Sequence, residues 1–302
     1  MINELKAKNL LHLHDVRKVY PDKKQEIGHK VILDDIDLSV KKGEFCTVVG
    51  PSGCGKSTLL RLILGQEQQT SGDITIEGEI VGMPDCNRGI VYQNYSLFDN
   101  KTVLENVMSA YYFKNNMFKR LLNRKEYKAA KDEAISYIKK VRLEDAMHKY
   151  PPELSGGMKQ RAAIAQALIA KPKILLMDEP FSALDPGTRE DLQLFTKEIA
   201  EENNMTVFFV SHDLEEAIFL GTRLLVVSQY YQKSGRSTDN HGARIVSDTD
   251  ISMFNSQKSK ETEEFGKKMQ EVRKIGFDPE YLQHVKNFDL SHKDSFSDEK
   301  YD

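Results

Sequence analysis

The chain has 302 residues, and its length predicts about two domains. It holds 43 lysines and arginines against 46 aspartates and glutamates, and the resulting net charge of −3 gives no electrostatic argument for nucleic acid as a partner. The three cysteines form no Cys-x-x-Cys pair, so they favour reduced thiols over a disulfide framework or a zinc site.

The N-terminal part of the chain predicts a β-rich start. The first ten residues lack the apolar core of a signal peptide, and no segment of the chain approaches the roughly 18 apolar residues of a membrane span. Leu10–Tyr20 and Val31–Val40 alternate between apolar and polar residues, which predicts two strands joined by a hairpin loop over Pro21–Lys30. Asp73–Val81 predicts a further pair of short strands, and Gly89–Gln93 a short buried one.

The segment Gly50–Thr58 (GPSGCGKST) follows a β-branched strand at Phe45–Val49 and precedes an apolar, helix-forming run. Glycines allow successive backbone N–H groups to turn toward an anion, and a helix N-terminus adds the positive end of its dipole. We therefore predict a phosphate-binding loop rather than an ordinary glycine turn. Lys56 is expected to bind the β- and γ-phosphates and the Ser57 hydroxyl to ligate magnesium. Cys54 lies near the same helix start and Lys56, which both favour its thiolate.

From Thr102 to about Tyr150 the pattern changes to helices. Within it, Lys114–Arg142 is locally basic. Such a segment is either a solvated helix face, which we favour, or a surface for anionic lipid headgroups or an acidic partner.

The second half of the chain alternates strands and helices. Strands are predicted over Lys173–Asp178, Met205–Ser211 and Arg223–Ser228, with helices between them, and this order is typical of a parallel sheet covered on both faces. Asp213 is the expected N-cap of a helix over Leu214–Leu220. Residues 229–242 are expected to form a loop. The charged segment after Asp248 is expected to hold short helices, with Thr262–Lys274 as one candidate, and to end in disorder.

One predicted strand ends, and one predicted helix begins, with residues that can bind magnesium or phosphate. The strand at Ile174–Asp178 ends in Asp178 and Glu179; an aspartate at such a strand end holds magnesium, and the adjacent glutamate can accept a proton from water. The alternative is a strand capped by acidic turn residues. Leu154-Ser155-Gly156-Gly157 presents backbone N–H groups and a hydroxyl at a helix start, which indicates either a second anion site or a flexible turn.

Together, five motifs resemble the ATP-binding cassette of ABC transporters over residues 10 to 230. They are GPSGCGKST, LSGGMKQR, ILLMDEP, SALD at Ser182–Asp185 and SHD at Ser211–Asp213. The segments MPDCNRGIVYQ, TVLENV and DEPFSALD are further similar to the nitrate/sulfonate/taurine importer ATPases. The resemblance implies an α/β fold of the P-loop NTPase, ABC-cassette type, with a parallel-sheet core, an antiparallel β subdomain and a helical subdomain at about 97–160. Residues 1–248 would be the cassette and 249–302 a charged, partly disordered extension.

The same resemblance implies a role for each matching residue. Glu179, His212 and Lys56 would be catalytic, and Ser57, Gln93 and Asp178 would bind Mg²⁺. Tyr20 would stack on adenine; as an alternative it is a core tyrosine at a strand end. The ATP-binding set would be Tyr20, Gly50, Pro51, Ser52, Gly53, Cys54, Gly55, Lys56, Ser57, Thr58, Gln93, Ser155, Gly156, Gly157 and Asp185, with Ser155, Gly156 and Gly157 binding the ATP of the opposite subunit.

By this resemblance the chain is expected to be an ATPase that powers a membrane importer for a small anionic solute such as nitrate, sulfonate or taurine. Its expected partners are a second ATP-binding subunit, transmembrane permease subunits and an extracytoplasmic solute-binding protein, with no nucleic acid. It would sit peripherally at the cytoplasmic face of the inner membrane. The alternatives are a soluble ABC-type ATPase acting on nucleic acid or ribosomes and another phosphate-loop enzyme, such as a nucleotide kinase. The kinase is disfavoured because it needs no LSGGMKQR.

Overall fold

The computed structural model describes residues 9–22, 28–93, 96–114, 124–232, 241–254 and 256–295. The chain divides into two compact units. Unit 1 contains residues 1–84 and 206–302, and unit 2 contains residues 85–205. Part of the predicted hairpin loop Pro21–Lys30 lies outside the described residues.

Unit 1 contains an antiparallel sheet with the strand order β2-β1-β4-β5. Its strands are β1 (Leu11–Pro21), β2 (His29–Val40), β4 (Ser71–Ile76) and β5 (Glu79–Ile80). The predicted pairing of the first two strands is present, with Leu11 opposite Val40 and Pro21 opposite His29. Their inward side chains are fully buried because the apolar residues alternate along each strand.

A second group of strands in unit 1 is ordered β11-β9-β3-β8. The strands β3 (Phe45–Val49), β8 (Thr206–Val210) and β9 (Arg223–Ser228) are parallel, whereas β11 (Arg244–Asp250) runs antiparallel to β9. Every residue of β3, β8 and β9 is buried, as expected for parallel strands covered on both faces. The carboxyl ends of β3 and β8 therefore lead into loops at the same edge, where ligands bind in open α/β sheets.

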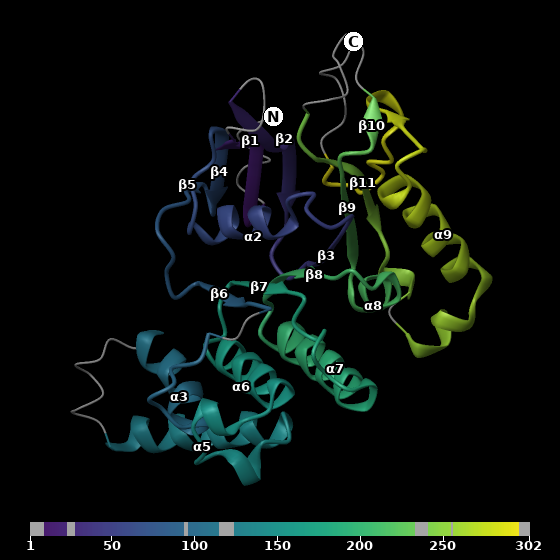
Figure 1. Ribbon diagram of the computed structural model, residues 1–302. Coiled ribbons are helices and arrows are strands. Elements are labelled where there is room, and N and C mark those ends of the chain that lie inside the picture. Colours follow the sequence, from purple (N-terminus) through teal and green to yellow (C-terminus); the bar gives the residue numbers. More distant parts are fainter. Residues whose placement is uncertain are drawn as a thin grey trace. The chain divides into compact units, whose positions relative to one another are not determined.

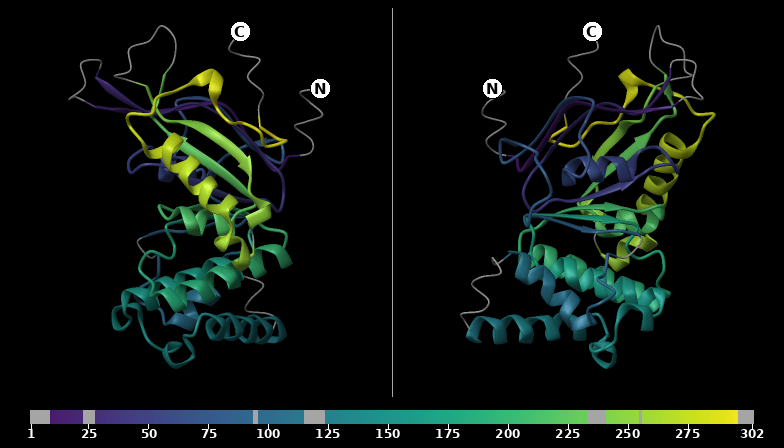
Figure 2. Two further views of the ribbon diagram at one scale, coloured as in Figure 1. Left: turned by 90° about the vertical axis from the view of Figure 1, so that its right-hand side faces the viewer. Right: turned by 60° about the vertical axis from the view of Figure 1, so that its left-hand side comes forward.

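Helices and short pairings complete unit 1 (Figure 1). Here α2 (Lys56–Leu64) packs on β8, and α8 (Leu214–Leu220) packs on β3. Next, α9 (Glu263–Phe277) lies along β9 and β11, as both views in Figure 2 show. The remaining elements are β10 (Tyr231–Gln232), which pairs with β12 (Gln283–His284), and the 3₁₀ turns Ser252–Phe254, Gln257–Glu261 and Val285–Asn287.

The segment after Asp248 differs from its prediction. Strand β11 runs through residue 248, so the structure places no unit boundary there. The predicted helix over Thr262–Lys274 is present as α9, and its Phe265 and Val272 are buried in the same core as Val226 of β9. The charged segment is thus an integral layer of unit 1. The predicted terminal disorder falls mostly on residues 296–302, which lie outside the described residues.

The buried side chain of Arg223 on β9 binds Asp248 of β11 and two residues that precede β3. Arg223 on β9 is 0% exposed, and its Nε and Nη2 atoms each donate to the carboxylate of Asp248 on β11 over 2.7 Å. Its Nη1 atom donates to Glu44 over 2.9 Å and to the Ser39 carbonyl over 2.7 Å. The Ser295 hydroxyl donates to the same Asp248 carboxylate. The guanidinium is therefore fully paired in a place that excludes water.

The described residues of unit 2 form two parallel strands and four helices. Strand β6 (Arg88–Val91) pairs with β7 (Ile174–Asp178). The helices are α3 (Val103–Lys114), α5 (Arg124–Lys140), α6 (Gly156–Ile169) and α7 (Pro186–Glu202), with 3₁₀ turns at Glu144–Ala146 and Pro151–Glu153. Residues 115–123 of the basic segment 114–142 lie outside the described residues; Lys125 and Lys128, which are described, are exposed on α5.

Candidate functional site

The predicted phosphate loop lies in unit 1 between β3 and α2. The Lys56 side chain is buried at the first position of α2. Its Nζ atom donates to the carbonyl oxygens of Gly50 and Pro51, over 2.7 and 2.9 Å. Two backbone carbonyl groups of the loop therefore point toward the Lys56 ammonium group. Phosphate oxygens are the stronger acceptors for such a cation, so they can replace these carbonyls when a nucleotide binds.

The loop needs glycine at Gly50 for a steric reason. Its φ is +153°, and a Cβ atom there would lie 1.9 Å from the carbonyl oxygen of Val227. Gly53 also has a positive φ, of +78°, but a Cβ atom there would meet nothing within 4 Å. An alanine would be strained by the positive φ at either position, but only at Gly50 would its Cβ atom also clash with a backbone carbonyl.

We expect Gly50→Ala to destabilise the protein by about 1–3 kcal/mol more than the matched control Gly53→Ala. The reason is that Gly50→Ala forces the loop away from β9, which also weakens ATP binding. Thermal unfolding and equilibrium binding of ATP measure the two effects. Equal unfolding temperatures for the two variants would contradict the steric reason.

The thiol of Cys54 differs from its sequence-based prediction. Cys54 is 1% exposed, and burial raises the pKa of its thiol, although Lys56 acts in the opposite direction. The Lys56 ammonium lies 4.0 Å from the sulfur but is engaged with the loop carbonyls. The expectation of a stabilised thiolate was therefore wrong, because desolvation outweighs the nearby cation.

We expect iodoacetamide at neutral pH to label the exposed Cys86 long before Cys54. The thiolate is the reacting form, so labelling of Cys54 should increase only as the pH rises above the usual thiol pKa. Mass spectrometry of Cys86→Ala and Cys54→Ala variants resolves the two sites. Equal rates for Cys54 and Cys86 at neutral pH would contradict the assignment of a buried, protonated thiol.

Tyr20 and His212 are the other two predicted residues in unit 1. Tyr20 is half-buried near the end of β1, so it is not a fully buried core tyrosine. His212 is exposed between β8 and α8. The following residue, Asp213, caps α8 as predicted, since its Oδ1 atom accepts from the N–H groups of Glu215 and Glu216.

The predicted carboxylates lie in unit 2. Asp178 ends β7, and Glu179 follows in the left-handed region with a φ of +49°. The Glu179 carbonyl accepts from the Ser182 hydroxyl over 3.0 Å, which holds the turn. The Gln93 Nε2 atom donates to the Glu179 carboxylate over 3.3 Å. This contact joins two residues to which the resemblance assigned different roles, a magnesium ligand and a catalytic residue.

The signature segment and Asp185 begin two helices of unit 2. Ser155 is the N-cap of α6, where its Oγ atom accepts from the Met158 N–H over 3.3 Å; Ser155 and Gly156 are exposed. Asp185 caps α7 by accepting from the Thr188 N–H over 2.9 Å, and this hydrogen bond lowers the pKa of its carboxyl. Both residues therefore act as N-caps, and at α7 the Asp185 carboxylate itself occupies the helix N-terminus.

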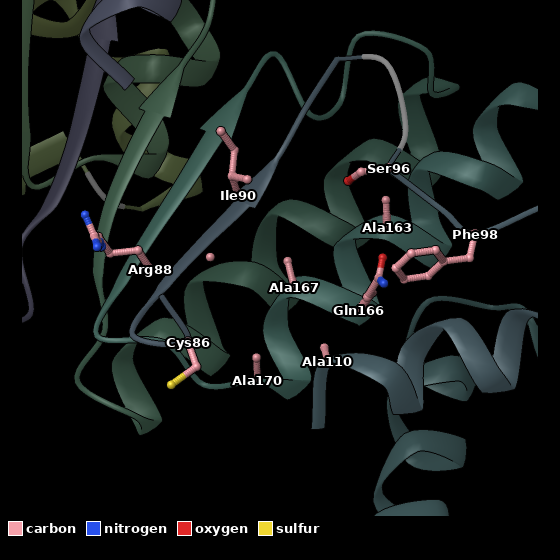
Figure 3. Close-up of a pocket in the computed structure, with 11 residues that line it drawn as sticks. Cys86, Arg88, Ile90, Ser96, Phe98, Ala110, Ala163, Gln166, Ala167 and Ala170 are labelled. Carbon is pink, nitrogen blue, oxygen red and sulfur yellow. The ribbon is translucent and has the colours of Figure 1, made fainter. Parts of the chain in front are cut away.

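Unit 2 also contains a pocket of about 250 Å³ (Figure 3). It lies just after Gln93 in sequence, since Ser96 and Phe98 form part of its wall. Strand β6 and helix α6 form much of the remainder, and their side chains there are largely small or apolar. The other lining residues are Cys86, Arg88, Gly89, Ile90, Ala110, Ala163, Gln166, Ala167 and Ala170.

Comparison with known proteins decides the family. A family model described as "ABC transporter" matches residues 33–182. The aliphatic sulfonates import ATP-binding protein of Bacillus cereus is 41% identical over 204 residues, which cover 68% of this chain and 76% of that protein. This chain belongs to the ABC transporter family. The nitrate import ATP-binding protein of Synechococcus elongatus is also 41% identical, over 218 residues covering 72% of this chain and 76% of that protein.

A solved structure of this ABC family supports the fold. The dimeric, post-hydrolysis ATP-binding cassette bound to ADP and phosphate has a TM-score of 0.64 and 32% identity, covering 71% of this chain and 93% of that one. The predicted fold class, family and importer subgroup are confirmed, and the chain is an ATP-binding cassette ATPase. Among the described residues, no helix is both long and apolar enough to cross a membrane.

Proposed function

We propose that this ABC ATPase is the energy-coupling subunit of a membrane importer for a small anionic solute such as nitrate, sulfonate or taurine. The observation that carries the proposal is the 41% identity to import ATP-binding proteins for sulfonates and for nitrate. The proposed partners are transmembrane permease subunits and an extracytoplasmic solute-binding protein. The proposed location is peripheral, at the cytoplasmic face of the inner membrane.

The proposed chemistry assigns ATP binding to unit 1 and water activation to unit 2. Lys56 and the loop N–H groups neutralise phosphate charge, Tyr20 stacks on adenine, and His212 contacts the γ-phosphate. The Glu179 carboxylate accepts the proton of the attacking water, and the hydrogen bond from Gln93 orients this carboxylate. Most of the rate enhancement then comes from positioning and electrostatics.

Magnesium is the proposed metal because the available donors are hard oxygen atoms. The Ser57 hydroxyl is half-buried in the first turn of α2, and the Asp178 carboxylate is half-buried at the end of β7. These two residues and the Gln93 amide oxygen would hold the ion. When bound, it would neutralise charge on the β- and γ-phosphate oxygens.

A second copy of the chain, or a close relative, is proposed to complete each site. The exposed helix start at Ser155, Gly156 and Gly157 would bind the γ-phosphate of the ATP held by the opposite subunit, and Asp185 would cross the same interface. ATP would then hold two subunits together, and hydrolysis would release them. The dimeric, ADP-bound cassette among the solved structures supports this proposal.

The permease is proposed to bind at the pocket of Figure 3. A predominantly apolar pocket lined by alanines suits a helix inserted from a partner. Ala167 lines the pocket from helix α6, so a larger side chain at this position would fill the pocket.

Co-expression with transmembrane permease subunits tests the proposal. We expect the ATPase to co-purify with a permease in detergent. The Ala167→Phe variant should lose the permease but keep the ATPase activity of the isolated subunit. Recovery with ribosomes or nucleic acid, in place of a membrane protein, would instead support the soluble ABC-type ATPase.

A further inference from the structure

Tyr20 is held by a carboxylate far from it in sequence. Its hydroxyl donates to the Glu67 carboxylate, which lies just beyond the end of α2. Burial, with this hydrogen bond, raises the pKa of Tyr20, so the hydroxyl remains a proton donor. This hydrogen bond holds the tip of the ring close to the end of α2.

Glu67 is the centre of a small network of donors. Its Oε1 atom accepts from Arg61 Nη1 over 2.9 Å, and its Oε2 atom lies 3.2 Å from Lys18 Nζ. Burial acts to raise the pKa of the Glu67 carboxyl, but the hydrogen bonds from Tyr20, Arg61 and Lys18 outweigh it, and the net direction is down. The carboxylate is therefore ionised while it holds three partners.

The Lys18 ammonium lies over one face of the Tyr20 ring. The Lys18 ammonium lies 4.8 Å from the centre of the Tyr20 ring and donates to the Gln68 carbonyl over 2.7 Å. A cation held over one face of an aromatic ring makes a cation–π contact there. A nucleobase can then stack only on the opposite face.

The same network joins Tyr20 to the phosphate-binding helix. The Thr58 hydroxyl, in the first turn of α2, hydrogen-bonds to the Tyr20 hydroxyl. One turn later on α2, Arg61 holds Glu67. Because α2 begins with Lys56, the phosphate ligand and the aromatic ring are attached to one rigid helix.

We propose that Glu67 is a positioning residue for ATP: it fixes the Tyr20 ring at a set distance from Lys56 so that base and phosphates bind together. The inference rests on the proposed stacking of Tyr20 on adenine. It goes further by assigning a role to a residue that lies outside every motif of the sequence. A positioned ring lowers the entropy cost of binding, and so acts on affinity rather than on the chemical step.

Glu67→Ala and Tyr20→Phe are expected to raise the KM for ATP by about 3- to 10-fold, the value of one hydrogen bond. Because neither residue touches the phosphates, kcat should stay within about twofold. The effect of the double variant should be smaller than the sum of the two single effects, since the Tyr20–Glu67 bond is lost in both. Glu67→Gln keeps an oxygen that accepts from Tyr20, so it should recover much of the affinity. Glu79→Ala, on exposed β5 of the same sheet, is the matched control.

Steady-state kinetics of the isolated subunit, with binding of a fluorescent ATP analogue, measure these effects without any permease. They are therefore independent of whether the protein is an importer. Tyr20→Ala should raise KM further, by about 5- to 100-fold, the value of a stacked base. If Tyr20→Ala raises KM but Glu67→Ala and Tyr20→Phe leave it unchanged, the role of Glu67 is overturned and the stacking role survives. An unchanged KM for Tyr20→Ala overturns both.

Discussion

Replacing Glu179 by glutamine is expected to lower ATP turnover by about 10²- to 10⁴-fold, the usual contribution of a general base. The substitution keeps the shape of the side chain and removes its ability to accept a proton. The amide still has an oxygen that can accept from Gln93, now 3.3 Å from the carboxylate, so the turn should keep its geometry. ATP binding should be unchanged because Lys56 and the loop N–H groups are intact.

The same variant should accumulate as an ATP-bound dimer, since the step that separates the subunits is removed. Single-turnover hydrolysis, binding of ATP and size-exclusion chromatography with ATP measure the three properties. Glu201→Gln, exposed on α7 of the same unit, is the control and should behave as the parent protein. Hydrolysis by Glu179→Gln at the parent rate would refute the assignment of the general base.

Replacing Arg223 by methionine is expected to reduce the free energy of unfolding by about 3–5 kcal/mol, the cost of removing one member of a buried ion pair. Asp248 is 3% exposed and would lose both of its 2.7 Å hydrogen bonds from the guanidinium. Glu44 and the Ser39 carbonyl would lose donors as well. Chemical denaturation followed by circular dichroism gives the value.

Two comparisons isolate the buried charge as the cause. Lys267→Met removes the exposed partner of Glu263 on α9, and should change stability by no more than about 0.5 kcal/mol. The double variant Arg223→Met/Asp248→Leu should recover part of the loss, since it leaves no buried charge unpaired at that pair. A loss below 1 kcal/mol for Arg223→Met would show that water reaches Asp248.

Strand β11 illustrates what sequence reasoning could not foresee. The sequence of β11, RIVSDTD, contains one arginine and two aspartates, and the sequence analysis predicted no strand there. In the structure Ser247, Asp248 and Thr249 are buried. Burial of Asp248 is possible only because Arg223, distant in sequence, neutralises it. Local composition contains no information about that pairing, whereas the apolar run of β3 defines its strand without any partner.

The candidate functional site likewise contains features that the local sequence predicts and contacts that it does not. Residues 50–58 were predictable because the loop requires a strand, glycines and a helix in immediate succession, and all three are local. The contact between Gln93 and Glu179 and the one between Tyr20 and Glu67 each join residues from separate elements. The resemblance implied that Gln93 and Asp178, the neighbour of Glu179, share a magnesium ion, whereas Glu67 belongs to no motif and its contact with Tyr20 could not be predicted. Unit 2 spans residues 85–205 and includes the pair of strands β6 and β7. The helical subdomain expected at about 97–160 stays a prediction.

The place of β3 in its sheet determines when the phosphate loop can form during synthesis. Strand β3 pairs on one side with β8 and on the other with β9, although the ribosome produces it long before either. The whole of unit 2 is translated in between as one continuous stretch. Because long-range pairings form only once both strands exist, unit 2 can fold first while β3 still has neither neighbour. Strand β3, which leads into the nucleotide-binding loop, can therefore have both of its neighbours only after Ser228 has left the ribosome.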